Sequence, residues 1–270
     1  MSVKITTLIE NLAYGDKLMG EHGLSLLIET DDGSILFDTG QSGKFIDNAR
    51  VLGVDLSKIR AVALSHGHYD HTGGLEAFCA VNDSAKIYAK RGLFVPKYKK
   101  AGSTEQKFIG TPYLPRIYQN RIHWVDRPTE ILPNLVLIPE TPLVNDWDTH
   151  FGSMFVQTES GFEPDVFDDE QFLIVRRPES IDVVSGCSHR GITNIAAAAS
   201  MFAQKPIRLV LGGFHTKDAE SQAVEALISD LSRRGVEKLG VCHCTGVEKY
   251  PEIKRIFGGN AFYSYTGLSM

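Results

Sequence analysis

The sequence predicts a layered domain of the α/β class, in which helices cover β-sheets. In the last third of the chain, segments of strand composition alternate with segments of helical composition, which is typical of such layers. Some strand segments are apolar throughout, as strands covered on both faces are. At 270 residues, 43% of them hydrophobic, the chain is long enough to bury a substantial core. We therefore expect residues 1–270 to form a single domain.

Local composition predicts the elements of the first third. The N-terminal residues favour a strand, and two more β-rich segments flank the turn Asp31-Asp32-Gly33. A glycine break at Asp38-Thr39-Gly40 ends the second of these segments. We expect strands over residues 24–30, 34–38 and 61–65, and helices over 43–52 and 75–81.

Residues 91–150 differ in composition, with many prolines and aromatic residues and both tryptophans. We interpret this range as connecting strands with an excursion that forms one wall of a pocket, and a plain surface elaboration is the alternative. Its lysines Lys97, Lys99 and Lys100 would attract an anionic substrate in the first case and would simply be solvated in the second.

The alternation in the rest of the chain predicts its remaining elements. Glycines such as Gly235 and Gly258 stand where helices would end. We expect strands over 121–125, 135–138, 181–185, 207–211, 238–241 and 261–265, and helices over 191–203, 219–234 and 247–257.

The densest group of metal-ligand residue types follows the apolar strand at 61–65. His66, His68, Asp70 and His71 lie in one short run, and glycines beside them allow a tight turn. Imidazole and carboxylate together suit zinc, iron or manganese. His66 and His68 can chelate one ion, while Asp70 and His71 serve a neighbouring ion, so that two ions activate one water.

One loop cannot complete two coordination shells, so other strand ends must contribute. His189, His215 and His243 each follow a predicted strand and precede a predicted helix, and we expect at least two of them to be ligands. Cys242 and Cys244 flank His243 and would face away from it in an extended chain, so we do not predict them as ligands. Cys187 shares a face with His189 and is a weaker candidate beside the ligands.

The run His66-Gly67-His68-Tyr69-Asp70-His71 resembles the HxHxDH signature of the metallo-β-lactamase superfamily. Further blocks are similar to a branch of that superfamily related to dihydropterin-ribofuranosyl-aminobenzene phosphate synthase. These blocks are Glu21-His22-Gly23-Leu24-Ser25, Leu36-Phe37-Asp38-Thr39-Gly40, Gly186-Cys187-Ser188-His189, Gly212-Gly213-Phe214-His215 and His243-Cys244-Thr245-Gly246.

The resemblance implies a four-layer αββα sandwich with metals held at one edge. It implies that the ligands are His66, His68, Asp70, His71, His189 and His243, with Asp38 supporting their loop. The usual bridging aspartate has no clear counterpart at a later strand end. His215 is left as either a ligand or a proton donor, and His22 as a residue that lines the pocket.

These residues predict a hydrolase of an ester or phosphoester substrate, with Asp70 and His215 as catalytic residues and two divalent ions, zinc first and iron or manganese as alternatives. A transferase acting on a pterin pyrophosphate, a di-iron redox protein and a non-enzymatic metal-binding module are the competing hypotheses. We expect a small anionic substrate.

The net charge of −5 argues against a nucleic-acid binder, and no apolar run suits a membrane span. No cleavable leader or disulfide pattern is evident, so we expect a cytoplasmic protein with reduced thiols.

Overall fold

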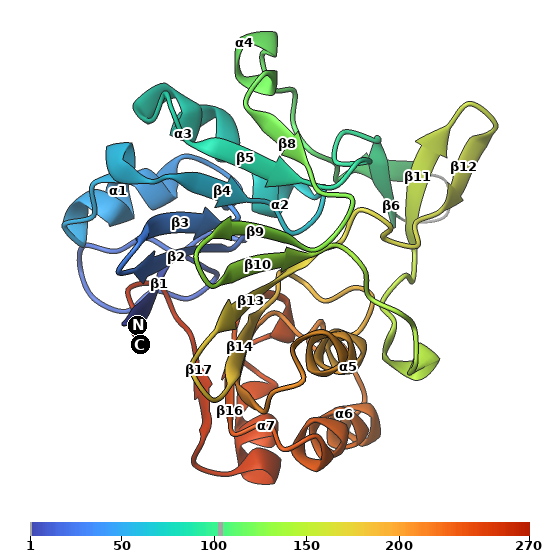
Figure 1. Ribbon diagram of the computed structural model, residues 1–270. Helices are drawn as coiled ribbons and strands as arrows, with labels where there is room; N and C mark the ends of the chain where they lie inside the picture. The colour runs from blue at the N-terminus through green and yellow to red at the C-terminus, as the bar shows by residue number, and fades with distance from the viewer. Residues whose placement is uncertain (1, 102–104) are drawn as a thin grey trace. The chain divides into compact units, whose positions relative to one another are not determined.

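The computed structural model describes residues 2–101 and 105–270, and these residues form two compact units. Unit 1 runs over Met1–Asp126, Phe151–Glu170 and Thr266–Met270, and unit 2 over Arg127–His150 and Gln171–Tyr265. Each unit has its own sheet and helices (Figure 1). The predicted α/β class is confirmed.

The main sheet of unit 1 begins antiparallel and continues parallel. Its order is β1 (Val3–Ile9), β2 (Ser25–Thr30), β3 (Gly33–Phe37), β4 (Ala61–Ala63), β5 (Lys86–Ala89) and β8 (Ile122–Trp124). The hairpin β2–β3 turns at Asp31-Asp32, as its composition predicts. Because β3 and β4 are parallel, the residues that follow them, Asp38 and the loop from Leu64, lie at the same edge of the sheet.

Apolar side chains pack the unit 1 helices against this sheet. Phe45 of α1 (Lys44–Val51) and Phe78 of α3 (Leu75–Val81) are fully buried in a cluster with strand residues such as Leu36. Burying each such side chain contributes roughly 1.5–3 kcal/mol. Shorter helical elements are η1 (Leu56–Lys58), α2 (Tyr69–Thr72) and α4 (Arg116–Gln119).

A second sheet of unit 1 has the order β12-β11-β6-β7. Its strands are β12 (Gly161–Pro164), β11 (Met154–Thr158), β6 (Lys97–Ala101) and β7 (Glu105–Phe108). This sheet accounts for part of the predicted excursion over 91–150, of which residues 102–104 lie outside the described residues. The rest of that range is divided between the two units at Asp126.

The sheet of unit 2 is parallel on one side and antiparallel on the other. Its order is β17 (Ala261–Tyr263), β16 (Lys238–Val241), β15 (Ile207–Gly212), β14 (Ile181–Val184), β13 (Phe172–Arg176), β10 (Leu135–Ile138) and β9 (Thr129–Leu132). Strands β14 to β17 are mutually parallel, so their C-terminal ends share one edge.

In Figure 1, α5 (Ile192–Ala203) lies beside β14 and α7 (Tyr250–Phe257) beside β17, while α6 (Ser221–Arg233) packs against α5 and α7. The short helices η2 (Asp146–Asp148) and η3 (His243–Thr245) belong to the same unit. Alanines of α5 allow close packing, since Ala196 and Ala199 are fully buried.

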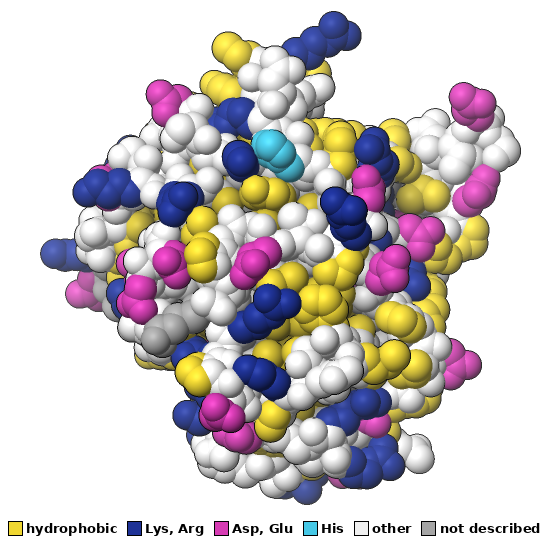
Figure 2. Space-filling view, in the orientation of Figure 1, with side chains coloured by type: hydrophobic (Ala, Val, Ile, Leu, Met, Phe, Trp, Pro, Cys, Tyr) yellow, Lys and Arg dark blue, Asp and Glu magenta, His cyan; other side chains and the backbone are white. Residues whose placement is uncertain are grey.

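Basic and acidic side chains are interspersed on the face drawn in Figure 2.

The strands and helices expected from composition all appear, with bounds that differ by a few residues at most. The strands that were not predicted, such as β5 and β11, are short and lack strict alternation of apolar and polar residues. None of the described helices is long and apolar enough to cross a membrane.

Candidate metal centre

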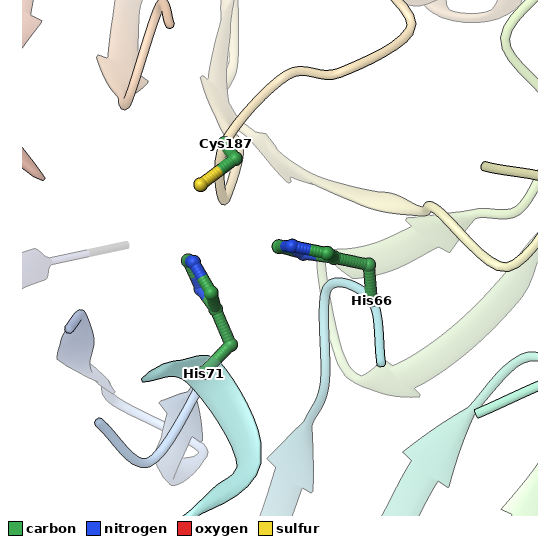
Figure 3. A group of neighbouring side chains, drawn as sticks. All are labelled: His66, His71 and Cys187. Atoms are coloured by element: carbon green, nitrogen blue, oxygen red, sulfur yellow. The ribbon is translucent and has the colours of Figure 1, made fainter. Parts of the chain in front are cut away.

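The histidine-rich loop of unit 1 gathers three imidazoles into a buried cluster. His66 follows β4, His68 precedes α2 in an extended conformation, and His71 lies on α2. The ring centroid of His66 is 4.6 Å from that of His68 and 4.3 Å from that of His71. A ligand atom of His66 lies within 4.8 Å of one on each of the other two. Figure 3 shows His66 on its loop and His71 on α2, and it also draws Cys187 of unit 2.

Asp38 determines which nitrogen of His66 and of His71 is available to a metal. Its Oδ2 accepts a hydrogen bond from His71 Nδ1 at 2.7 Å and another from Ser65 Oγ at 2.7 Å. Because the hydroxyl hydrogen of Ser65 points to Asp38, Ser65 Oγ can only accept from His66 Nδ1, which lies 2.9 Å away. Both histidines therefore carry hydrogen on Nδ1 and have a lone pair on Nε2, the form that binds metals.

Burial keeps His66 neutral. It is fully buried, and desolvation, followed by the nearby His71 and His68, holds the pKa of His66 well below its ordinary value. Neutral imidazole is the ligand form, so the loop holds His66 ready for a metal ion at neutral pH.

Asp70 lies on the same loop and contacts His22. Asp70 Oδ2 is 3.1 Å from His22 Nε2 and 3.9 Å from His71 Nε2. Asp70 is buried, while the side chain of His22 is half exposed. His22 thus lies beside a predicted ligand within unit 1.

In unit 2, the predicted histidines lie at one edge of the sheet. His189, His215 and His243 follow β14, β15 and β16, which are adjacent and parallel. His215 and His243 both have φ of +52°, and in unit 1 Asp38 has φ of +62°. Left-handed backbone in residues other than glycine is uncommon and gathers at functional sites. The backbone at these strand ends therefore turns sharply and redirects the side chains.

The left-handed backbone at His243 places two cysteines near its imidazole. The expectation that Cys244 faces away from His243 assumed an extended chain, but His243–Thr245 is the short helix η3. One ligand atom from each of Cys187, His243 and Cys244 lies within 4.8 Å of the others. The extended-chain assumption was wrong, and thiol sulfur joins the candidate donors of unit 2.

Sequence reasoning missed His150 and Asp148. The His150 ring stacks on His215 with centroids 5.0 Å apart, and the backbone N–H of His150 donates to the carbonyl of His189 at 2.7 Å. Asp148 Oδ1 lies 3.5 Å from His150 Nε2, and Oδ2 accepts from Thr193 N and Oγ1 at 2.8 and 2.7 Å. Asp148 ends the short helix η2 and His150 follows it, and so short an element has no periodicity that a sequence pattern could reveal.

We expect Asp148→Ala to lower the free energy of unfolding by about 1–2 kcal/mol, because Asp148 caps the N-terminus of α5 through Thr193 N. The midpoint of urea unfolding measures this loss. Asp146→Ala, at an exposed position of η2, is the control and should change stability by less than about 0.5 kcal/mol. Equal effects of the two substitutions would contradict the capping role.

The interpretation of Lys97 as a surface lysine was wrong. Lys97 is only 2% exposed, and its Nζ bonds to Asp165 and Asp169. A buried charge needs such partners, so Lys97 is not available to attract a substrate. Lys99 and Lys100 on the same strand are exposed.

The donor set fits a divalent transition metal. In unit 1 the cluster has three buried imidazoles, two of them with assigned tautomers, and a buried carboxylate, and in unit 2 the strand-end group has imidazoles and thiols. Zinc and iron bind these donors, whereas magnesium prefers oxygen.

Comparisons with known proteins agree with this chemistry. The family model described as "Metallo-beta-lactamase superfamily" matches residues 18–159, more than half of the 270 residues. A relative from Methanocaldococcus jannaschii, named 7,8-dihydropterin-6-methyl-4-(beta-D-ribofuranosyl)-aminobenzene-5'-phosphate synthase, is 29% identical over 265 residues, which cover 91% of this chain and 88% of the relative.

Solved structures share the fold. The crystal structure of Tm1679, described as a metal-dependent hydrolase of the beta-lactamase superfamily, has a TM-score of 0.87 and 32% identity over 100% of this chain and 98% of its own. Zn(2+)-bound PqqB from Methylobacterium extorquens has a TM-score of 0.59 at 13% identity, over 99% of each chain, and is similar in fold alone.

Proposed function

Because the chain belongs to the metallo-β-lactamase superfamily, we propose that it is a metal-dependent hydrolase that cleaves an ester or a phosphoester. The superfamily consists largely of metal-dependent hydrolases. The observation that carries the proposal for this chain is the network from Asp38 through Ser65 and His71. It leaves the Nε2 lone pairs of two buried imidazoles for a metal ion.

In this proposal two divalent ions bind the chain, with zinc as the first choice and iron or manganese as alternatives. His66, His68, Asp70 and His71 are the ligands from unit 1, and His189 and His243 are those from unit 2. Such ions supply a water of lowered pKa and polarise the bond to be cleaved. The thiols near His243 favour zinc or iron over manganese.

The chain's own residues orient the nucleophile and move a proton. Asp70 accepts a hydrogen bond from the attacking water as well as binding metal, and His215 donates a proton to the leaving group as general acid. The stacked ring of His150 restricts the rotation of His215. A small anionic substrate fits a site rich in cationic metal and imidazole, with the exposed Lys99 and Lys100 adding a weak attraction.

A transferase is the second candidate, and the name of the 29% identical relative favours it. In that reaction an aminobenzene acceptor would attack the carbon that carries the pyrophosphate, pyrophosphate would leave and the acceptor would lose a proton, while bound metals would neutralise the charge of the leaving group. Product analysis with a pterin pyrophosphate and an aminobenzene acceptor separates the two candidates, because only the transferase joins the two compounds.

Elemental analysis of the purified protein is the first test. We expect about two ions per chain in the wild type. His66→Ala and His243→Ala should each lose part of this metal, because each removes a ligand. His123→Ala changes an exposed histidine of β8 that stacks on Tyr88, and it should keep the wild-type content.

Hydrolysis is then assayed with phosphodiesters, phosphomonoesters, lactones and thioesters. At least one class should be cleaved by the metal-loaded wild type and not by His66→Ala. If no class is cleaved by fully loaded protein, the hydrolase proposal is wrong. Iron with redox-dependent visible absorption would instead favour the redox alternative.

A further inference from the structure

A buried ion cluster in unit 1 has no part in the proposed reaction. Lys97 of β6 bonds through Nζ to Asp165 Oδ2 at 2.7 Å and to Asp169 Oδ1 at 2.9 Å. The three side chains are 2–4% exposed. Burial lowers the pKa of Lys97, but the charges of Asp169 and Asp165 and their hydrogen bonds outweigh it and raise the pKa above its ordinary value. The cluster thus holds one cation and two acidic groups in a dry environment.

Such a cluster is costly to bury. Buried ion pairs give little net stability compared with apolar residues of the same size, although removing one partner is strongly destabilising. Stability alone therefore does not explain why Lys97 is buried in this cluster. The hydrogen bond made by the other carboxylate oxygen of Asp169, Oδ2, points to a second role.

Asp169 reaches the metal-ligand loop directly. Its Oδ2 accepts a hydrogen bond from the backbone N–H of Gly67 at 2.7 Å, across 102 residues of sequence. Gly67 stands between His66 and His68, so this bond holds the peptide that joins the two ligands. A Cβ at Gly67 would come within 2.9 Å of Asp169 Oδ2 and 2.5 Å of the Leu93 carbonyl oxygen. The loop is therefore packed tightly against its anchor.

The aromatic ring of Phe167 supports the same loop. It contacts the rings of His68 and His66 edge to face, with centroids 5.4 and 6.2 Å away. Lys97 Nζ lies 5.1 Å from the centroid of this ring. Phe167 has φ of +54°, and its N–H donates to Asp165 Oδ1 at 2.8 Å. The cluster thus holds both the backbone and the rings of the loop.

We propose that Asp169, held in place by Lys97, is a positioning residue that fixes the peptide between His66 and His68 and so orients their imidazoles for metal. This inference rests on the proposed function, because it assigns a purpose to the anchor only if the loop binds a metal ion. Asp169 acts through the backbone of Gly67 and does not contact the metal itself.

Two isosteric variants test the proposal. Asp169→Asn and Asp165→Asn each remove one carboxylate from the cluster and leave Lys97 paired with the other, so both should fold. In Asp165→Asn the amide oxygen still accepts from Phe167 N and Asp169 still accepts from Gly67. In Asp169→Asn the single amide oxygen faces the charged Lys97, the stronger donor, so the NH₂ group faces Gly67 N and that anchoring bond is lost.

The first readout is hydrogen exchange of residues 65–72 in protein stripped of metal by a chelator. Asp169→Asn should speed exchange of this loop about fivefold to tenfold, because an anchoring hydrogen bond is lost, and Asp165→Asn should leave it near the wild-type rate. The second readout is zinc affinity by competition with a chromophoric chelator, together with the visible spectrum of the cobalt-substituted protein. Asp169→Asn should weaken zinc binding by about 10–100-fold and shift the cobalt spectrum, while Asp165→Asn changes affinity by less than about threefold.

The outcomes separate this inference from the proposed function. Equal effects of the two variants on exchange, or none, overturn the inference whatever the metal content. Faster hydrogen exchange of residues 65–72 in Asp169→Asn, together with unchanged zinc affinity, also overturns the inference. If the wild type binds no metal while the exchange difference persists, the anchor is real but the proposed function and the positioning role both fail.

Discussion

Asp38→Asn is expected to weaken metal binding by about 10–100-fold while the protein stays folded. Asp38 is fully buried and accepts from Ser65 N, Ser65 Oγ and His71 Nδ1, each at 2.7 Å. Asparagine has nearly the same shape and tolerates the left-handed backbone of this position, where φ is +62°. The substitution therefore changes the hydrogen-bond chemistry with little change in geometry.

The loss comes from the imidazole tautomers. An asparagine NH₂ group facing His71 Nδ1 needs an acceptor there, so the hydrogen of His71 moves to Nε2 and the lone pair for metal is lost. If the amide turns the other way, its NH₂ group takes the place of Oδ1 and faces the backbone N–H of Ser65, so two donors meet and the bond that holds the start of the histidine loop is lost. The first orientation removes the lone pair of His71 that faces the metal, and the second loosens the loop that carries His66.

Zinc affinity by chelator competition measures this effect. Asp182→Asn is the matched control, because Asp182 is also fully buried but bonds to Arg177 and Arg208 in unit 2. We expect that control to lose stability and keep its zinc affinity. Wild-type affinity in Asp38→Asn would show that Asp38 does not set the tautomers.

Gly73→Ala and Gly74→Ala are expected to destabilise the protein by about 3 kcal/mol or more and to lower its metal content. Both glycines have φ values that any residue adopts, −65° and −82°, so backbone strain is not the reason. The reason is steric overlap of the added methyl group with the backbone. A Cβ at Gly73 would overlap the carbonyl oxygens of Gln41 and Tyr69, and one at Gly74 would overlap those of Thr39 and Ser42.

These contacts join the loop of Asp38 to the loop of the histidines. Thr39 N donates to His71 O at 2.7 Å, and Gly74 N donates to Gly40 O at 3.2 Å. These bonds hold the two loops together, so the carbonyl oxygens beside the glycines can make room for a methyl group only if the loops separate. Separation would also lengthen the bond from Asp38 to His71, and metal binding should fall with stability.

Urea unfolding and elemental analysis measure the two effects. Gly259→Ala is the control, since nothing lies within 4 Å of a Cβ built there and its φ is not positive. Its stability should stay within about 0.5 kcal/mol of the wild type. If Gly73→Ala unfolds at the same urea concentration as this control, close packing of the two loops is not important for stability.

The amino-acid sequence determined the elements and the histidine-rich loop, because both depend on neighbouring residues. Alternating composition predicts β14 to β17 and the helices between them, since side-chain periodicity is a local property. The spacing of His66, His68, Asp70 and His71 predicts a metal-binding loop. The placement of His189, His215 and His243 after parallel strands follows from the same reasoning.

Only the tertiary structure decided where the side chains around these residues point and what holds them. The left-handed backbone at His243 turns Cys244 toward Cys187, which no periodicity indicates. Asp169 reaches Gly67 from 102 residues away, and Lys97 is buried although its neighbours on β6 are exposed lysines. Hydrogen bonds between segments distant in sequence, and the desolvation that requires them, exist only once the sheets have formed, so composition and spacing have no means of predicting them.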